Sequence, residues 1–360
     1  MNHNLSLVMN IWMGIGALYI FALGILLLWH VTRHWNDIVK KKFRISELFV
    51  VALFFFQGIQ IFTLFHNSDS ESIRWLSIFF CSLLFLEFVI LFGGNILPNI
   101  IKQRKNPQFR AEYTYYHFLD QMAQTKTKIS KKSLLFRDLS RKGLHFIQFL
   151  GVVLIYWLSI ANYPYRILIG IEPDEFRNFF FFLISALFWI MMMIGDITRM
   201  ENWRVLPKWA WKWYSVSLDY PRESWTINAA TPILLANLIW TNRIFPIQIL
   251  FIAVWISCIS DAAAALVGKF FGQYHLNKIG KFPEKTWEGL IAGILTTLIG
   301  TGGILYFIPT SFPPLAIIMI LGGTVSVFAI TDLYCSTLND NIVNSLASGT
   351  VIWLIFLIFA

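Results

Sequence analysis

Residues 246–268 read PIQILFIAVWISCISDAAAALVG, and Asp261 is the only charged side chain in this run. A helix needs about 20 mostly apolar residues to cross the hydrocarbon core of a bilayer, and this run is long enough. A carboxylate at membrane depth is costly and by default marks a functional site. The run therefore predicts the fold class and also indicates where the chemistry lies.

The rest of the chain has the same apolar character. Of its 360 residues, 57% are hydrophobic and 14% are charged, against about 25% charged in an average soluble domain. The 34 Phe and 15 Trp residues are more apolar bulk than a soluble fold could cover, because folding buries only about 60–75% of the surface of a chain. We therefore expect an integral membrane protein, an all-α polytopic transmembrane helix bundle.

About ten apolar runs are predicted to span the membrane. The run at 226–241 is the weakest, because it is short and contains Pro232. The first run has no basic segment before it, so we interpret it as a retained span rather than a cleaved signal peptide. The predicted spans are 11–30, 46–66, 75–96, 143–161, 179–195, 226–241, 246–268, 288–308, 313–331 and 342–360.

The basic residues fall in alternate loops. The segments 31–44, 97–142, 196–225 and 269–287 hold 25 of the 29 Lys and Arg residues. Cytoplasmic loops retain positive charge during insertion, so these segments are predicted to face the cytoplasm and both termini to lie outside. The net charge of +9 then needs no nucleic-acid partner. The basic, aromatic-rich segment 97–142 is expected to lie against anionic lipid headgroups.

With this orientation, the unusual polar side chains collect on the cytoplasmic side. Carboxylates can hold Mg²⁺, which usually bridges to substrate phosphates, and Lys and Arg can neutralise phosphate oxygens. The pattern predicts a cytoplasmic site for a metal-bound polyphosphate substrate next to lipid. The candidate metal ligands are Asp261, Asp332 and Asp340; the candidate phosphate ligands are Arg141, Lys142, Lys269 and Lys285; His145, Asp196, Arg199, Arg222 and Glu223 are predicted on the same side.

Each of these features also has a structural interpretation. Gly268 belongs to a ladder of small residues four positions apart, a pattern typical of close helix packing. Asp261 could pair with a basic neighbour, and Asp196 with Arg199 could form an i,i+3 ion pair at a helix end. His145 could simply hydrogen-bond at the membrane interface, and the basic loops could set the topology alone.

Two motifs carry a resemblance to a known group of enzymes. The sequence SDAAAALVGKFFG at 260–272, followed by KTWEG at 285–289, resembles the shared C-terminal region of the CTP-using membrane lipid enzymes. That superfamily contains the phosphatidate cytidylyltransferases and the CTP-dependent lipid kinases, which are dolichol kinase, yeast-type diacylglycerol kinase, and phytol and farnesol kinases. The resemblance implies a seven-span catalytic domain at 137–360, preceded by a three-span region with a basic loop at 1–136.

The motifs divide between the two branches. The KTWEG sequence resembles the cytidylyltransferases, whereas RKGLH at 141–145, DITR at 196–199 and NDN at 339–341 resemble elements of the kinases. The kinases often carry a Glu upstream of the last motif, and here only Asp332 is nearby. The resemblance favours a kinase that transfers the γ-phosphoryl group of CTP to a lipid alcohol with Mg²⁺. A phosphatidate cytidylyltransferase is the alternative enzyme, and a transporter is the alternative from another class.

The resemblance also implies roles for single residues. Asp261 would be a metal ligand or general base, and Asp340 with Asn341 would complete the metal or nucleotide site. His145 would orient the hydroxyl of a polyprenol, diacylglycerol or similar lipid alcohol. The residues expected to contact the phosphates of CTP are Arg141, Lys142, Gly268, Lys269, Lys285, Thr286 and Glu288.

The predicted topology can be tested by cysteine labelling. A single cysteine placed at Ser70 or Ser311 should react with a membrane-impermeant reagent added to intact cells, because both positions lie in outward loops of the predicted topology. A cysteine at Asn277 should react only after the membrane is opened. Labelling of Asn277 from outside would remove the basis for a cytoplasmic site.

Overall fold

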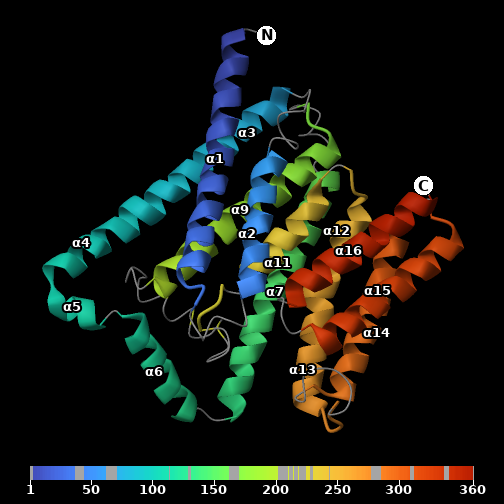
Figure 1. Ribbon diagram of the computed structural model, residues 1–360. Helices are drawn as coiled ribbons and strands as arrows, with labels where there is room; N and C mark the ends of the chain where they lie inside the picture. The colour runs from blue at the N-terminus through green and yellow to red at the C-terminus, as the bar shows by residue number, and fades with distance from the viewer. Residues whose placement is uncertain are drawn as a thin grey trace. The chain divides into compact units, whose positions relative to one another are not determined.

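The computed structural model describes residues 3–36, 44–61, 71–112, 114–128, 131–161, 170–201, 210, 214, 218, 224–227, 230–242, 244–276, 285–308, 312–335 and 340–359. Within these residues every named element is a helix, and the extended contact between His275 and Thr286 is an isolated bridge. The prediction of an all-α chain is therefore confirmed for this part of the protein. The elements (Figure 1) are α1 (His3–Arg33), α2 (Arg44–Ile61), α3 (Glu71–Phe88), η3 (Val89–Ile96), α4 (Leu97–Lys105), α5 (Pro107–Glu112), α6 (Tyr115–Lys128), α7 (Lys131–Ala161), α9 (Pro173–Met200), α11 (Ala230–Leu238), η4 (Ile239–Thr241), α12 (Ile247–Val254), η5 (Trp255–Ser260), α13 (Asp261–Phe271), α14 (Trp287–Phe307), α15 (Pro314–Tyr334) and α16 (Asp340–Phe359).

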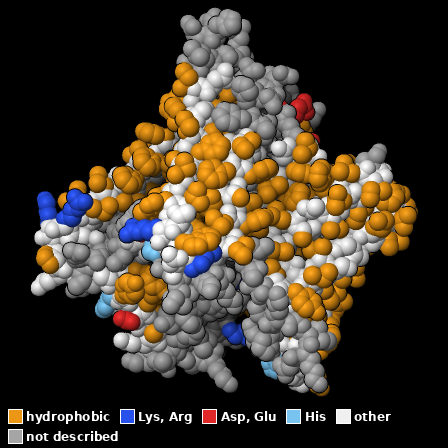
Figure 2. Space-filling view, in the orientation of Figure 1, with side chains coloured by type: hydrophobic (Ala, Val, Ile, Leu, Met, Phe, Trp, Pro, Cys, Tyr) orange, Lys and Arg blue, Asp and Glu red, His pale blue; other side chains and the backbone are white. Residues whose placement is uncertain are grey.

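Eight helices of the described chain are long and apolar enough to cross a membrane. They lie at eight of the ten predicted runs. At the other two runs the apolar helices His145–Ala161 and Thr231–Thr241 are shorter than the ~20 residues that a span needs. Hydrophobic side chains cover much of the described surface in Figure 2, as expected of a multi-pass membrane protein. The count of ten spans and the outward termini stay predictions.

The chain forms two compact units, which are described separately. One comprises Met1–Arg141 with Tyr163–Thr231, and the other comprises Lys142–Asn162 with Pro232–Ala360. This division differs from the predicted boundary at residue 136, because residues 163–231 lie with the N-terminal part. The predicted boundary marks where the enzyme motifs begin, and it stays a prediction about the catalytic region.

In the first unit, α1 packs on α2 and α3, and α3 packs on α9. Buried aromatic rings hold these helices together, for example Phe54 of α2 edge-on to Trp189 of α9, with ring centroids 4.7 Å apart. In the basic segment 97–142, all described residues except Asn106 and Thr114 are helical. Two of its aromatic side chains, Tyr115 and Phe118, are buried in a core with Tyr214 and Leu218 rather than presented outward.

In the second unit, α12, η5 and α13 form one continuous apolar helix over Ile247–Phe271. The middle segment, Trp255–Ser260, is π-helical and ends directly before Asp261. The helices α13, α14, α15 and α16 pack in chain order, and α12 packs on α16 (Figure 1). This bundle brings the start of α14 and the end of α15 toward the helix that carries Asp261.

The backbones of α13 and α14 lie in close contact. A Cβ atom added at Gly289 would lie 2.7 Å from the backbone oxygen of Ala264 and 3.0 Å from Cα of Gly268. Two backbones can approach this closely only where side chains are absent, which is the usual role of small residues in membrane helices. The ladder containing Gly268 therefore has the predicted packing function.

This contact predicts a difference between two substitutions in α14. Gly289→Ala should destabilise the protein by about 1–3 kcal/mol, because backbone atoms of α13 would have to move away. Gly303→Ala is the matched control, since no atom lies within 4 Å of the added Cβ and both changes gain the same helix propensity. Thermal unfolding of the purified proteins in detergent measures the difference. Equal stabilities would contradict the close contact between α13 and α14.

Candidate functional site

Asp261 is the first residue of α13 and is buried. Lys142 of α7 donates a hydrogen bond to its carboxylate oxygen Oδ2. Two ring contacts hold α7 along α12 and η5, with centroids 5.1 Å apart for Tyr156 and Phe251 and 5.0 Å apart for Phe149 and Trp255. The lysine therefore reaches Asp261 because aromatic packing fixes its helix.

A second lysine–aspartate pair lies between the start of α14 and the end of α15. The Nζ atom of Lys285 donates to Oδ1 of Asp332 at 2.5 Å and to the backbone oxygen of Asp332 at 2.6 Å. Asp332 is buried, and Lys285 is partly buried. A buried carboxylate is stable only with a partner of opposite charge and further hydrogen bonds, and Lys285 supplies both.

The position of Lys285 is set by the connection between α13 and α14. The amide of Leu276 donates to the carbonyl oxygen of Lys285 at 2.8 Å, and the amide of Trp287 donates to that of Tyr274 at 2.9 Å. Thr286 caps α14 by accepting from the amide of Gly289 at 3.3 Å. These bonds fix the backbone on both sides of Lys285.

Glu288 completes this connection. One oxygen of its carboxylate, Oε1, accepts from the amides of Gln273 and Tyr274 at 2.9 and 3.1 Å. The negative charge also lies in the first turn of α14, where it is favoured by the helix dipole. Glu288 and Thr286 therefore stabilise the connection that carries Lys285.

The two pairs belong to one electrostatic neighbourhood. The carboxylate of Asp261 is close enough to Lys142, His145 and Lys285 to interact with them electrostatically. The carboxylate of Asp332 interacts with those of Asp261 and Asp340. Five segments of the second unit thus bring together three carboxylates, two lysines and one imidazole, all of which the sequence analysis selected.

The charges of this group suit a metal–polyphosphate substrate. Three aspartates supply oxygen ligands of the kind that Mg²⁺ prefers. The two lysine ammonium groups nearly balance them, and both could pass from a carboxylate to a phosphate oxygen. A magnesium ion would neutralise part of the charge of a bound triphosphate, and the two lysines could neutralise more of it.

The other predicted site residues have different positions. Gly268 makes the helix contact described above, and the side chain of Lys269 is exposed. The backbones of Arg141 and Asn341 are helical, but their side chains lie outside the described part of the structure. Arg222 and Glu223 also lie outside the described residues.

No protein-family model, no curated protein and no solved structure matches the chain.

Asp196 and Arg199 form the predicted i,i+3 ion pair, and it is fully buried in the first unit. The Nε atom of Arg199 donates to Oδ1 of Asp196 at 2.9 Å. Its Nη1 atom donates to the Tyr115 hydroxyl and to the backbone oxygen of Ser224, both at 2.6 Å, and its Nη2 atom donates to the backbone oxygen of Thr226. Four acceptors from three segments therefore surround one guanidinium.

Tyr214 closes this cluster, with its ring 5.1 Å from the guanidinium carbon of Arg199. Burial raises the pKa of the Tyr214 hydroxyl well above its usual value, and the charge of Asp196 raises it further. The hydroxyl therefore stays protonated at physiological pH. Because four hydrogen bonds within the protein already hold its guanidinium, Arg199 fits a stabilising role better than a role in binding phosphate.

Sequence reasoning missed one group of polar side chains. His30 and His34 are four residues apart at the end of α1, and both contact the carboxylate of Glu201, directly after α9. The spacing of the histidines was visible, because residues four apart share one helix face. The partner carboxylate was not, since it is 171 residues from His30.

The Asp196–Arg199 cluster predicts unequal effects of two similar changes in α9. Asp196→Ala should destabilise the protein by about 3–5 kcal/mol, because it leaves a buried guanidinium unpaired. Asp174→Ala removes the acidic member of another i,i+3 pair on the same helix, Asp174 with Arg177, but this aspartate side chain is 72% exposed. That change should cost less than about 1 kcal/mol. Unfolding measurements that rank the variants in the opposite order would contradict the assignment.

Proposed function

We propose that the protein is an integral membrane, CTP-dependent lipid kinase. It would transfer the γ-phosphoryl group of CTP to the hydroxyl of a lipid alcohol of the polyprenol, diacylglycerol or phytol class, at the cytoplasmic face. The observation that carries the proposal is the neighbourhood of Lys142–Asp261 and Lys285–Asp332, with His145 and Asp340 close by. The motifs at 260–272 and 285–289 supply the identity of the nucleotide through their resemblance to the CTP-using enzymes.

In the proposed reaction, the lipid hydroxyl oxygen attacks the γ-phosphorus. The bond from that phosphorus to its bridging oxygen breaks, CDP leaves, and the hydroxyl proton passes to a base. Most of the rate enhancement in such a transfer comes from positioning and charge stabilisation rather than covalent chemistry. His145 is a suitable base because an imidazole accepts a proton near neutral pH.

The remaining roles follow from the charges. Asp261, Asp332 and Asp340 would hold Mg²⁺, whose chemistry is to neutralise phosphate charge. Lys142 and Lys285 would release their carboxylates and bind the phosphate oxygens. Each lysine would then bind an aspartate in the free protein and a phosphate in the complex. Arg141, Lys269 and Asn341 would contribute at the edge of the site.

The site favours an enzyme over a transporter. A transporter would be expected to gather its ionisable groups near the membrane midplane, beside broken helices. Here Asp340 begins α16, Lys285 lies two residues before α14, and Asp332 lies two residues before the end of α15. Asp261 differs, because it lies inside the continuous apolar helix Ile247–Phe271. Groups at helix ends are better placed to meet a soluble nucleotide at the membrane surface.

A phosphatidate cytidylyltransferase is the second candidate, on the strength of the sequence KTWEG at 285–289. In that reaction a lipid phosphate attacks the α-phosphorus of CTP, and pyrophosphate leaves. Thr286 and Glu288 stabilise the backbone around Lys285, a task that either reaction would require. This motif therefore weighs less against the kinase than the sequence alone suggests.

The two candidates predict different label transfers. Purified protein in mixed micelles with a lipid extract, given Mg²⁺ and CTP labelled at the γ- or the α-phosphorus, should move the γ label alone into lipid. Asp261→Asn should reduce this transfer at least 10²-fold, the order expected when a strong electrostatic contributor is lost. Asp174→Asn, in the other compact unit, is the control and should transfer label normally.

One outcome would overturn the kinase assignment, and two would overturn the role of Asp261 as a metal ligand. Transfer of the α label with release of pyrophosphate would promote the cytidylyltransferase. Normal turnover of a folded Asp261→Asn protein would reduce Asp261 to an ion-pair partner. Recovery of activity in the charge-swapped double variant Lys142→Asp/Asp261→Lys would lead to the same conclusion, because an ion pair alone survives reversal whereas a metal ligand does not.

A further inference from the structure

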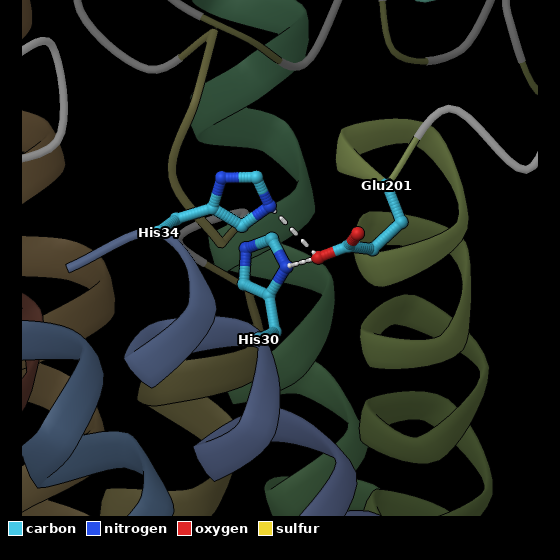
Figure 3. A group of neighbouring side chains, drawn as sticks. All are labelled: His30, His34 and Glu201. Carbon is cyan, nitrogen blue, oxygen red and sulfur yellow. Dashed lines mark hydrogen bonds and ion pairs between the residues drawn. The ribbon is translucent and has the colours of Figure 1, made fainter. Parts of the chain in front are cut away.

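The first unit holds a second cluster of polar side chains, distinct from the proposed kinase site. One ligand atom each from His30, His34 and Glu201 lie within 4.8 Å of one another. Figure 3 shows the two imidazoles, both from the end of α1, facing the carboxylate that follows α9. Two histidine nitrogens and one carboxylate oxygen form a common ligand set for Zn²⁺ and related ions.

The distances are close to those of a metal site. The Nε2 atom of His34 lies 3.0 Å from Oε1 of Glu201, and the Nδ1 atom of His30 contacts the same oxygen. Tetrahedral ligands with bonds of about 2.1 Å to Zn²⁺ lie ~3.4 Å apart. Small side-chain rotations would therefore open enough room for the ion, which would take the place of the protons now shared between these atoms.

Arg33 holds the other oxygen of the carboxylate. Its Nη1 atom lies 3.0 Å from Oε2 of Glu201, which leaves Oε1 for the two histidines. A side chain that hydrogen-bonds to a metal ligand orients that ligand and contributes to the affinity for the ion. The ion would bind through a single carboxylate oxygen, and the fourth position would be open to water or another ligand.

The surroundings favour a positive charge. The cluster lies where α1 and α9 both end, and the C-terminal end of a helix carries partial negative charge. His30 and the side chain of Glu201 are almost completely buried. Burial raises the pKa of the Glu201 carboxyl, but the hydrogen bond and charge of His30, aided by His34 and Arg33, hold it below its usual value. The carboxylate is therefore ionised and available as a ligand.

We propose that His30, His34 and Glu201 form a binding site for a first-row transition-metal ion, for which Zn²⁺ is the probe. The ion ties the end of α1 to the end of α9. Its ligands belong to neither lysine–aspartate pair, so the proposal stands or falls independently of the kinase function.

Metal binding by the full-length protein in detergent tests the proposal. After removal of metal with a chelator, the protein should bind about one Zn²⁺ per chain, and its midpoint of thermal unfolding should rise with added Zn²⁺. Mg²⁺, which prefers oxygen ligands, should produce no rise at the same concentration. His34→Gln and Glu201→Gln should each weaken Zn²⁺ binding at least tenfold, whereas His117→Gln, a change at an exposed histidine on α6, should bind as the unchanged protein does.

Arg33→Gln keeps the proposal falsifiable if a ligand variant fails to fold, since the Arg33 side chain is 54% exposed. It should bind Zn²⁺ more weakly while its unfolding midpoint in chelator changes little. Unchanged Zn²⁺ affinity in Arg33→Gln and in the folded ligand variants would place the bound ion elsewhere and overturn the proposal. A protein whose midpoint responds to neither Zn²⁺ nor chelator would have a metal-free hydrogen-bonded cluster, which would also overturn it.

Discussion

A charge inside an apolar helix bundle must have a partner, and this constraint organises both units of the protein. Removing an ion from water costs several kcal/mol even after the protein relaxes. Asp261, Asp196 and Glu201 each meet a basic side chain. Asp261 and Glu201 find theirs on another helix, and Arg199 joins Asp196 to two further segments. The pairs therefore determine which helix ends must lie together.

This constraint has a different consequence in each unit. Around Arg199, neutral backbone and hydroxyl oxygens complete the pairing, and the guanidinium donates four hydrogen bonds within the protein. At Asp261 and Asp332 the partners are lysines, whose single ammonium group exchanges easily between acceptors. The first arrangement is suited to stability. The second is suited to a site where charges are exchanged when a substrate binds.

The sequence predicted the helical class and the positions of the apolar runs well, because hydropathy acts over about 20 residues without long-range information. It also predicted the Asp196–Arg199 pair, since both residues are on one helix. It could not predict which lysine meets Asp261. Lys269 shares a helix face with Asp261, but the partner is Lys142, which aromatic packing of another helix brings near.

Contacts between distant residues account for most of what the sequence left open. Lys285 and Asp332 are 47 residues apart, and no local pattern joins them. Tyr115 and Phe118 resembled side chains of an interfacial segment, but they are buried against Tyr214 and Leu218. Such pairings depend on how helices pack, which becomes visible only when the chain is folded.

The number of residues in the π-helical stretch Trp255–Ser260 sets the direction in which the Asp261 side chain points from its helix. A π-helical turn holds one residue more than the α-helix around it, and each residue turns an α-helix by about 100°. Loss of a single residue from this stretch would leave a regular helix and would turn Asp261 by about 100° relative to α12. Asp261 would then face away from Lys142, so the site depends on the number of residues in a segment whose side chains take no part in the proposed chemistry.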